Sequence, residues 1–162
     1  MTKIGKFLGL LALIVALPIG ALAREGVPII EHNDILISTG SGKPATADQV
    51  RDAIITAAGL RNWEVTRNAT QNSLTATLNV KGRHSVAVAI PYSAETFSVK
   101  YLNSVNMNYR LSEEKSAETS SDLTKVNAPA AAIKPGTPLI HPSYNRWVQD
   151  LMRGIQFELK KL

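Results

Sequence analysis

The spacing of apolar residues changes near residue 60 from a helical period to a period of two, which predicts an α+β fold. Residues 46–59 repeat apolar side chains at helical spacing. Thr46 and Gln49 form the two ends of a capping-box pattern, and Gly59 predicts the end of this helix. The apolar stripe comprises Val50, Ala53, Ile54, Ala57 and Ala58.

Strict alternation after this helix predicts an antiparallel meander of about four strands, because short polar connections separate the alternating segments. Met107 and Tyr109 extend the last alternating pattern. The alternating segments are residues 63–65, 74–80, 86–92 and 97–101. The residues expected on a solvated face of the sheet are Thr75, Thr77, Asn79 and Lys81.

A second amphipathic helix is predicted at the C-terminal end of the chain. His141 is expected at its N-cap and Pro142 at the first helical position, where a missing N–H is harmless. Asn145 and Arg146 fall away from the apolar stripe. Both helices are expected on one face of the sheet, since this arrangement buries every apolar side. The stripe comprises Tyr144, Trp147, Val148, Leu151, Ile155, Leu159 and Leu162.

Two segments fall outside these patterns. Residues 24–45 are assigned to an extended N-terminal arm, in which residues 24–38 could also form an edge strand, because Pro28 fits an edge rather than a central position. Its glycine-rich turn departs from a phosphate-binding loop, because Ile37 replaces the required glycine and Pro44 the required Ser or Thr. Residues 111–139 are polar and charged and then rich in Ala and Pro, which predicts a disordered loop acting as a spacer.

Residues 1–23 have the features of a bacterial signal peptide. Lys3 and Lys6 precede an apolar run over residues 7–19, and small residues lead to a predicted cut after Ala23. The run is shorter than the roughly 20 residues that a membrane-spanning helix needs. We therefore expect a periplasmic protein, or alternatively a secreted one, that is not an integral membrane protein after cleavage.

Composition narrows the classes of partner. The chain has no cysteine, which excludes a cysteine-linked lipid anchor, disulfides and thiolate metal sites. Its 18 Lys and Arg against 13 Asp and Glu become 16 against 13 once Lys3 and Lys6 leave, a net charge of +3. These cations are scattered, so a nucleic-acid partner is not expected. The sequence does not predict the oligomeric state.

Candidate chemistry is sparse. His32, His84 and His141 lie on separate segments without metal-ligand spacing, so we expect neither a metal nor another cofactor. The serine hydrolase pattern Gly-x-Ser-x-Gly is absent. The aromatic residues Tyr92, Tyr101, Tyr109, Tyr144 and Trp147 fit either a ligand groove or the core, and their strand and helix spacing favours the core. The candidate ligand-binding residues are Asn106, Tyr109, His141 and Asn145.

Five stretches in order, at residues 27–29, 46–54, 74–80, 101–109 and 140–148, resemble a family of small exported proteobacterial proteins. Its members are often labelled putative lipoproteins, and their function is unassigned. The resemblance covers most of residues 27–162; it implies an envelope location and offers no catalytic residues. The chain departs from the family in lacking the lipid-bearing cysteine and in its long 111–139 insertion. The layout is also similar to envelope modules of the BON type, which is fold analogy alone.

These observations predict a non-enzymatic soluble periplasmic protein that binds an envelope component or a protein partner. Two alternatives remain open. One is a periplasmic hydrolase with a site near His141, and the other is a secreted interaction factor that uses the loop 111–139.

Overall fold

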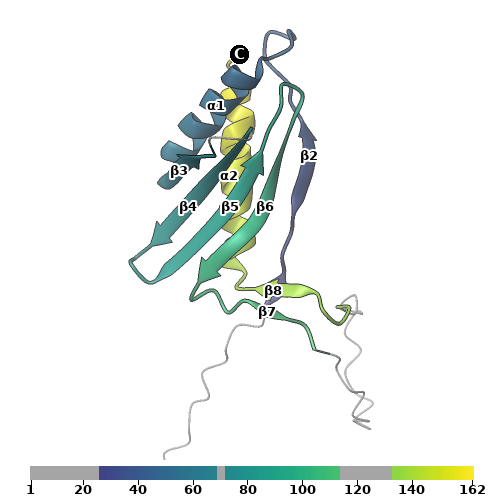
Figure 1. Cartoon of the computed structure of the whole chain (residues 1–162), viewed down its shortest axis with the longest axis vertical. Helices are drawn as coiled ribbons and strands as arrows, with labels where there is room; N and C mark the ends of the chain where they lie inside the picture. Colours follow the sequence, from purple (N-terminus) through teal and green to yellow (C-terminus); the bar gives the residue numbers. More distant parts are fainter. Residues whose placement is uncertain (1–25, 69–71, 114–132) are drawn as a thin grey trace, which may run out of the picture.

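The computed structural model describes residues 26–68, 72–113 and 133–162, which form an α+β fold (Figure 1). The helices are α1 (Ala47–Gly59) and α2 (Ser143–Leu159). The strands are β1 (Val27–Pro28), β2 (His32–Leu36), β3 (Trp63–Arg67), β4 (Ser73–Val80), β5 (His84–Pro91), β6 (Thr96–Val105), β7 (Arg110–Leu111) and β8 (Pro138–Ile140).

Two antiparallel sheets organise these elements. The larger sheet has five strands in the order β2-β6-β5-β4-β3, and both helices cover one of its faces (Figure 1). The smaller sheet has three short strands in the order β1-β8-β7. It lies at the end of the larger sheet where α2 begins, opposite the C-terminus of the chain (Figure 1).

The predicted meander corresponds to β3, β4, β5 and β6, and β2 adds a fifth strand at the edge beside β6. This fifth strand comes from the segment for which an edge strand and an extended arm were both open, and the structure shows the edge strand. A register shift lies between His32 and Ile35, and Asp34 adopts a left-handed φ of 49°. The shift interrupts the period of two, which is why alternation did not decide between a strand and an arm there.

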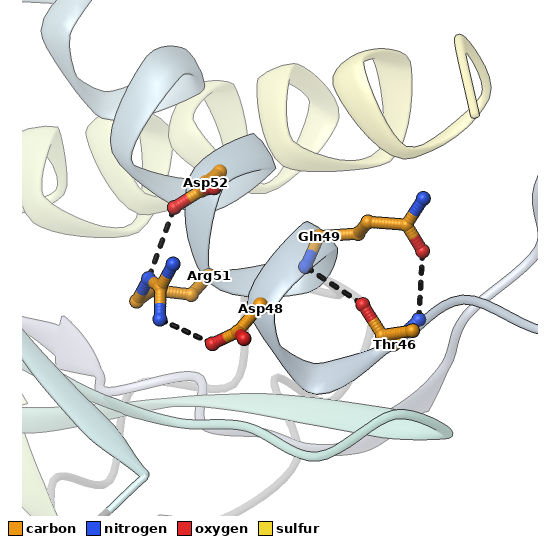
Figure 2. A network of polar contacts seen from close by, with 5 residues as sticks. All are labelled: Thr46, Asp48, Gln49, Arg51 and Asp52. Carbon is orange, nitrogen blue, oxygen red and sulfur yellow. Dashed lines mark hydrogen bonds and ion pairs between the residues drawn. The ribbon is translucent and has the colours of Figure 1, made fainter.

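The capping box of α1 is present (Figure 2). The Thr46 hydroxyl accepts a hydrogen bond from the Gln49 amide at 3.2 Å, and the Gln49 side chain accepts one from the Thr46 amide at 2.9 Å. The helix ends at Gly59 as predicted, but the left-handed residue after it is Asn62, with φ 59°. Gly59 therefore does not act as a left-handed cap.

The core lies between the helices and the larger sheet. The five stripe residues of α1 are all buried. In α2, Tyr144, Val148, Leu151, Ile155 and Leu159 are buried, while Trp147 and Leu162 pack partly against the core. Helix α2 begins at Ser143 with Pro142 at the N-cap, one residue later than expected.

Residues 111–139 differ from the predicted disordered loop at both ends. Leu111 belongs to β7, and β8 covers the other end of the segment. Leu139 and Ile140 are buried, and β8 pairs with both β1 and β7. The strands that pair with β8 are distant from it in sequence, so local composition could not indicate that residues 138–140 form a strand. Residues 114–132 of the predicted loop lie outside the described residues.

The strand pattern expected through Met107 and Tyr109 stops earlier. Strand β6 ends at Val105, because Asn106 and Asn108 adopt left-handed φ values of 57° and 52°. Met107 between them is buried, and Tyr109 is exposed.

Across the part of the chain that the structure describes, no helix combines the length and apolar character needed to cross a membrane.

Candidate functional site at the small sheet

The four candidate residues all lie at the end of the molecule that carries the small sheet. Asn106 and Tyr109 follow β6, whereas His141 and Asn145 flank the start of α2. The His141 amide donates a hydrogen bond to the carbonyl oxygen of Met107 at 2.8 Å, which joins the two segments. The structure therefore brings the four residues to one region, and most of their polar atoms have partners there.

Asn145 holds the N-terminal segment against α2. Its Oδ1 accepts a hydrogen bond from the Ile30 amide at 3.1 Å, and its Nδ2 donates one to the Pro28 carbonyl at 2.8 Å. The carboxamide thus binds backbone groups as a neighbouring strand would. Both of its polar atoms are engaged, which gives Asn145 a structural role in this arrangement.

Asn106 fixes the turn between β4 and β5. Its Nδ2 donates a hydrogen bond to the Arg83 carbonyl at 2.6 Å. The backbone oxygen of Asn106 lies 2.8 Å from Nδ1 of His84, so this nitrogen carries the hydrogen in that bond. Both interactions tie the end of β6 to the adjacent turn.

His141 caps the start of α2 although it is not the N-cap residue. Its Nδ1 accepts a hydrogen bond from the Ser143 amide at 3.1 Å. This bond satisfies one of the free amides of the first helical turn and requires an unprotonated Nδ1. The prediction that His141 is the N-cap residue is therefore wrong by one position, although its ring does bind an amide of the first turn.

Tyr109 is the outermost ring of an aromatic row. It stacks on Tyr101 with ring centroids 5.1 Å apart and planes 3° from parallel. Tyr101 in turn meets Tyr144 edge-to-face at 5.6 Å. Tyr144 is 1% exposed and Tyr109 is 46% exposed. The expectation that the aromatic residues form the core holds for Tyr144, holds partly for Tyr92, Tyr101 and Trp147, and is wrong for Tyr109.

The phenol of Tyr144 remains protonated in this setting. Burial raises its pKa well above the ordinary value of 10, and the nearby Tyr101 and Glu31 add to the shift. A phenolate nucleophile or base at Tyr144 is therefore disfavoured at neutral pH.

The histidines do not converge. Among the described residues, no three His, Cys, Asp or Glu side chains are placed to hold a metal ion. His32 lies opposite Val99 in the larger sheet, and burial lowers the pKa of its imidazole below 6.5. His84 and His141 bind neighbouring backbone groups instead.

Several exposed apolar side chains and cations belong to the segments at this end of the molecule, and we name this set the basal surface. Ser112 donates its hydroxyl to the Lys134 carbonyl at 2.6 Å and so joins the two ends of the predicted loop. The exposed apolar side chains of the basal surface are Ile30, Val105, Tyr109, Leu111 and Ile133. Its exposed cations are Lys81, Arg83, Arg110 and Lys134.

Sequence reasoning found only Tyr109 of this surface. The other apolar residues lie in short segments or at the end of a strand, and no periodicity marks them. The available signal was the recurrence of a large apolar residue directly beside a cation, as in Arg110-Leu111 and Ile133-Lys134.

A cleft of about 460 Å³ is lined by residues of the connection from β2 to α1 and of the turn between β5 and β6. These segments lie at the opposite end of the molecule (Figure 1). The lining of the cleft includes Leu36, Lys43 and Glu95, and a smaller cleft of about 160 Å³ adjoins it through Leu36 and Ser38. The glycine-rich turn that departs from the phosphate-binding motif forms part of this lining. None of the four candidate residues lines either cleft.

Comparison with known proteins gives no match to any protein-family model, to any curated protein or to any solved structure. The resemblance to exported proteobacterial proteins therefore stays a prediction.

Proposed function

We propose that the chain is a non-enzymatic exported protein of the bacterial periplasm that binds an envelope component or a protein partner through its basal surface. The signal-peptide features of residues 1–23 support the export. The observation that carries the proposal is the gathering of apolar side chains at one end. Five of the nine exposed large apolar residues in the described part belong to the basal surface.

This gathering favours binding because exposed apolar surface is unfavourable in water, at roughly 25 cal/mol for each Å². Single exposed apolar residues are ordinary, whereas a group of them rimmed by polar residues marks an interaction site. The stacked pair of Tyr109 and Tyr101 also holds the outer ring in place, which lowers the entropy lost on binding.

The competing function, a periplasmic hydrolase near His141, has less support. A hydrolase needs a nucleophile and a base free to exchange protons with the substrate. Nδ1 of His141 binds the Ser143 amide, and both polar atoms of Asn145 bind the N-terminal segment. A secreted factor that uses residues 111–139 would share the basal surface through Leu111 and Ile133.

Site-specific photo-crosslinking in the envelope tests the proposed function. Leu111 and Phe157 are similarly exposed, at 55% and 62%, and lie at opposite ends of the molecule. We expect p-benzoylphenylalanine in place of Leu111 to give a crosslinked adduct. The same photoreactive residue in place of Phe157 should give none. Equal adducts from both positions, or an adduct from Phe157 alone, would contradict the proposal.

A further inference from the structure

We propose that a second copy of this chain pairs with the open edge of the larger sheet at β3 and so forms a two-fold symmetric dimer. This inference goes beyond the proposed function and concerns a part of the fold outside the basal surface. It follows from the difference between the two sheet edges, the direction of the backbone groups of β3 and the order of charged residues along this strand.

The two edges of the larger sheet differ in their capacity to accept another strand. At β2, the register shift between His32 and Ile35 and the left-handed Asp34 interrupt the edge. Irregularities of this kind oppose the pairing of a further strand. At β3, all five residues pair with β4 without a register shift, and no described strand lies on the other side (Figure 1). The regular, uncovered edge is therefore the one at β3.

The alternation of the ladder shows which backbone groups of β3 face this open side. The Asn68 amide donates a hydrogen bond to the Ser73 carbonyl at 3.2 Å, so the even-numbered residues of β3 bond with β4. The N–H and C=O groups of Trp63, Val65 and Arg67 therefore point away from β4. Outside the strand ladder, no hydrogen bond joins these three residues to another described residue. Such outward backbone groups are the ones that an added strand binds.

The charged residues of β3 are placed so that the strand is complementary to itself. A two-fold axis normal to the sheet can place Val65 opposite Val65 of the second copy. In this register, Trp63 lies opposite Arg67 of the copy, and both residues present outward backbone groups. Glu64 lies opposite Thr66 of the copy. The register thus pairs the whole strand and puts no like charges opposite each other, an arrangement that would be destabilising.

The neighbouring registers are less favourable. A shift of the copy by two residues in one direction places Glu64 opposite Glu64. The same shift in the other direction leaves only residues 65–67 paired. The order of residues in β3 therefore favours one register, and that register forms the largest number of backbone hydrogen bonds between the copies.

The pairing also preserves the two-layer arrangement of the fold. A two-fold axis normal to the sheet does not exchange its faces, so the helices of both copies cover the same face of the joined sheet. Val65 is half-buried in the single chain and has an identical apolar side chain opposite it in the dimer. Contact between the two removes further apolar surface from water.

Sedimentation velocity of the purified exported protein, at concentrations up to about 1 mM, tests the inference. We expect an equilibrium between monomer and dimer that shifts towards the dimer as the concentration rises. A protein that remains monomeric throughout this range would overturn the inference.

Charge variants at Thr66 test the register. This exposed residue lies opposite Glu64 of the copy twice in the symmetric dimer. Thr66→Lys creates two pairs of opposite charge and should tighten association by about fivefold, whereas Thr66→Glu creates two pairs of like charge and should weaken it by about fivefold. The exported chain has a net charge of +3, so an effect of net charge alone has the opposite sign for each variant. Those opposite signs would contradict the proposed pairing.

Two further comparisons serve as controls. Asn33→Lys and Asn33→Glu change an exposed residue at the other sheet edge and should alter association by less than about twofold. The double variant Glu64→Lys, Thr66→Glu restores opposite charges across the interface and should associate more tightly than Thr66→Glu. Effects at Asn33 equal to those at Thr66, or a double variant no tighter than Thr66→Glu, would argue against pairing through β3.

Amide hydrogen exchange measured by NMR locates the dimer contact. Exchange at Val65 and Arg67 should slow as the concentration rises, while the Thr66 amide, which faces β4, should exchange slowly at every concentration. A dimer with unchanged exchange at Val65 and Arg67 would use another surface and would overturn the inference. An envelope protein that slows these amides while the chain stays monomeric would show that the edge binds a different occupant and would likewise overturn it.

Discussion

The helix-covered part of the larger sheet and the basal end are held together by different means. In the first region, side chains such as Leu151, Ile155 and Val88 are fully buried in one continuous core. At the basal end, the backbone is fixed by side-chain hydrogen bonds from Asn145, Asn106 and Ser112, and apolar groups remain exposed. The fold thus buries most of its apolar side chains between the helices and the larger sheet and leaves several of them exposed at the basal end.

The largest expected effect comes from making the same substitution in the two regions. Leu151→Ala creates a cavity at a residue that is 0% exposed and should lower the free energy of unfolding by about 3 kcal/mol. Leu111→Ala removes a side chain that is 55% exposed and should lower it by less than about 1 kcal/mol. Urea unfolding measures the change in the free energy of unfolding for each variant. Similar changes in the two variants would contradict a difference in packing between the two regions.

The next effect concerns close packing at the end opposite the basal surface. A Cβ at Gly40 would lie 2.2 Å from the backbone oxygen of Lys160, so Gly40→Ala should destabilise the protein by about 2 kcal/mol. Gly59 has nothing within 4 Å of such an atom, and Gly59→Ala should stabilise by about 0.5 kcal/mol. Thermal unfolding of the pair checks the opposite signs, and a neutral Gly40→Ala would show that this contact is loose.

A smaller and local effect is expected from Asn145→Ala. The substitution removes both hydrogen bonds to the N-terminal segment and should lower the free energy of unfolding by about 1 kcal/mol. Hydrogen exchange should accelerate mainly at residues 26–31, because the core does not depend on this contact. Gln149→Ala, at an exposed position on the same helix, serves as the control. Acceleration spread evenly over the sheet would argue against a separately held basal end.

The smallest expected effect is a pH dependence. Burial lowers the pKa of His32 below 6.5, so the folded protein binds fewer protons than the unfolded chain just below that pH. Stability should therefore decrease as the pH falls below about 6.5 and should level off once the folded-state pKa is passed. His32→Gln should reduce this slope, and an unchanged slope would contradict the assignment to His32. Unfolding curves from pH 5 to 8 check the assignment.

The sequence predicted the elements whose signals are local. The capping box at Thr46 and Gln49, the alternation of β4 and the stripe of α2 are each contained within a short stretch, and all are present in the structure. Strand β8 was missed and β2 was left as one of two alternatives because their partners are distant, as in the pairs His32 with Val99 and Leu139 with Arg110. A short apolar stretch beside Pro or a bulge carries little periodicity.

At the candidate site too, the sequence revealed what depends on local spacing and missed what depends on contacts between distant segments. The helical pattern shows that Asn145 lies outside the apolar stripe. It cannot show that the backbone of residues 28–30 binds the Asn145 side chain. Alternation assigned Tyr109 to the core, whereas the left-handed Asn106 and Asn108 turn the chain out of the sheet. Asparagine tolerates this conformation more readily than most residues, so the spacing Asn106-Met107-Asn108 was the available warning.

Hydrogen–deuterium exchange of the exported protein, alone and with envelope vesicles, tests the assignment of binding to the basal end most directly. The account predicts slower exchange in the vesicle-bound protein at residues 26–31, 104–113 and 133–141, with no change at residues 36–45 around the cleft. Protection confined to residues 36–45, with the basal segments unchanged, would contradict it.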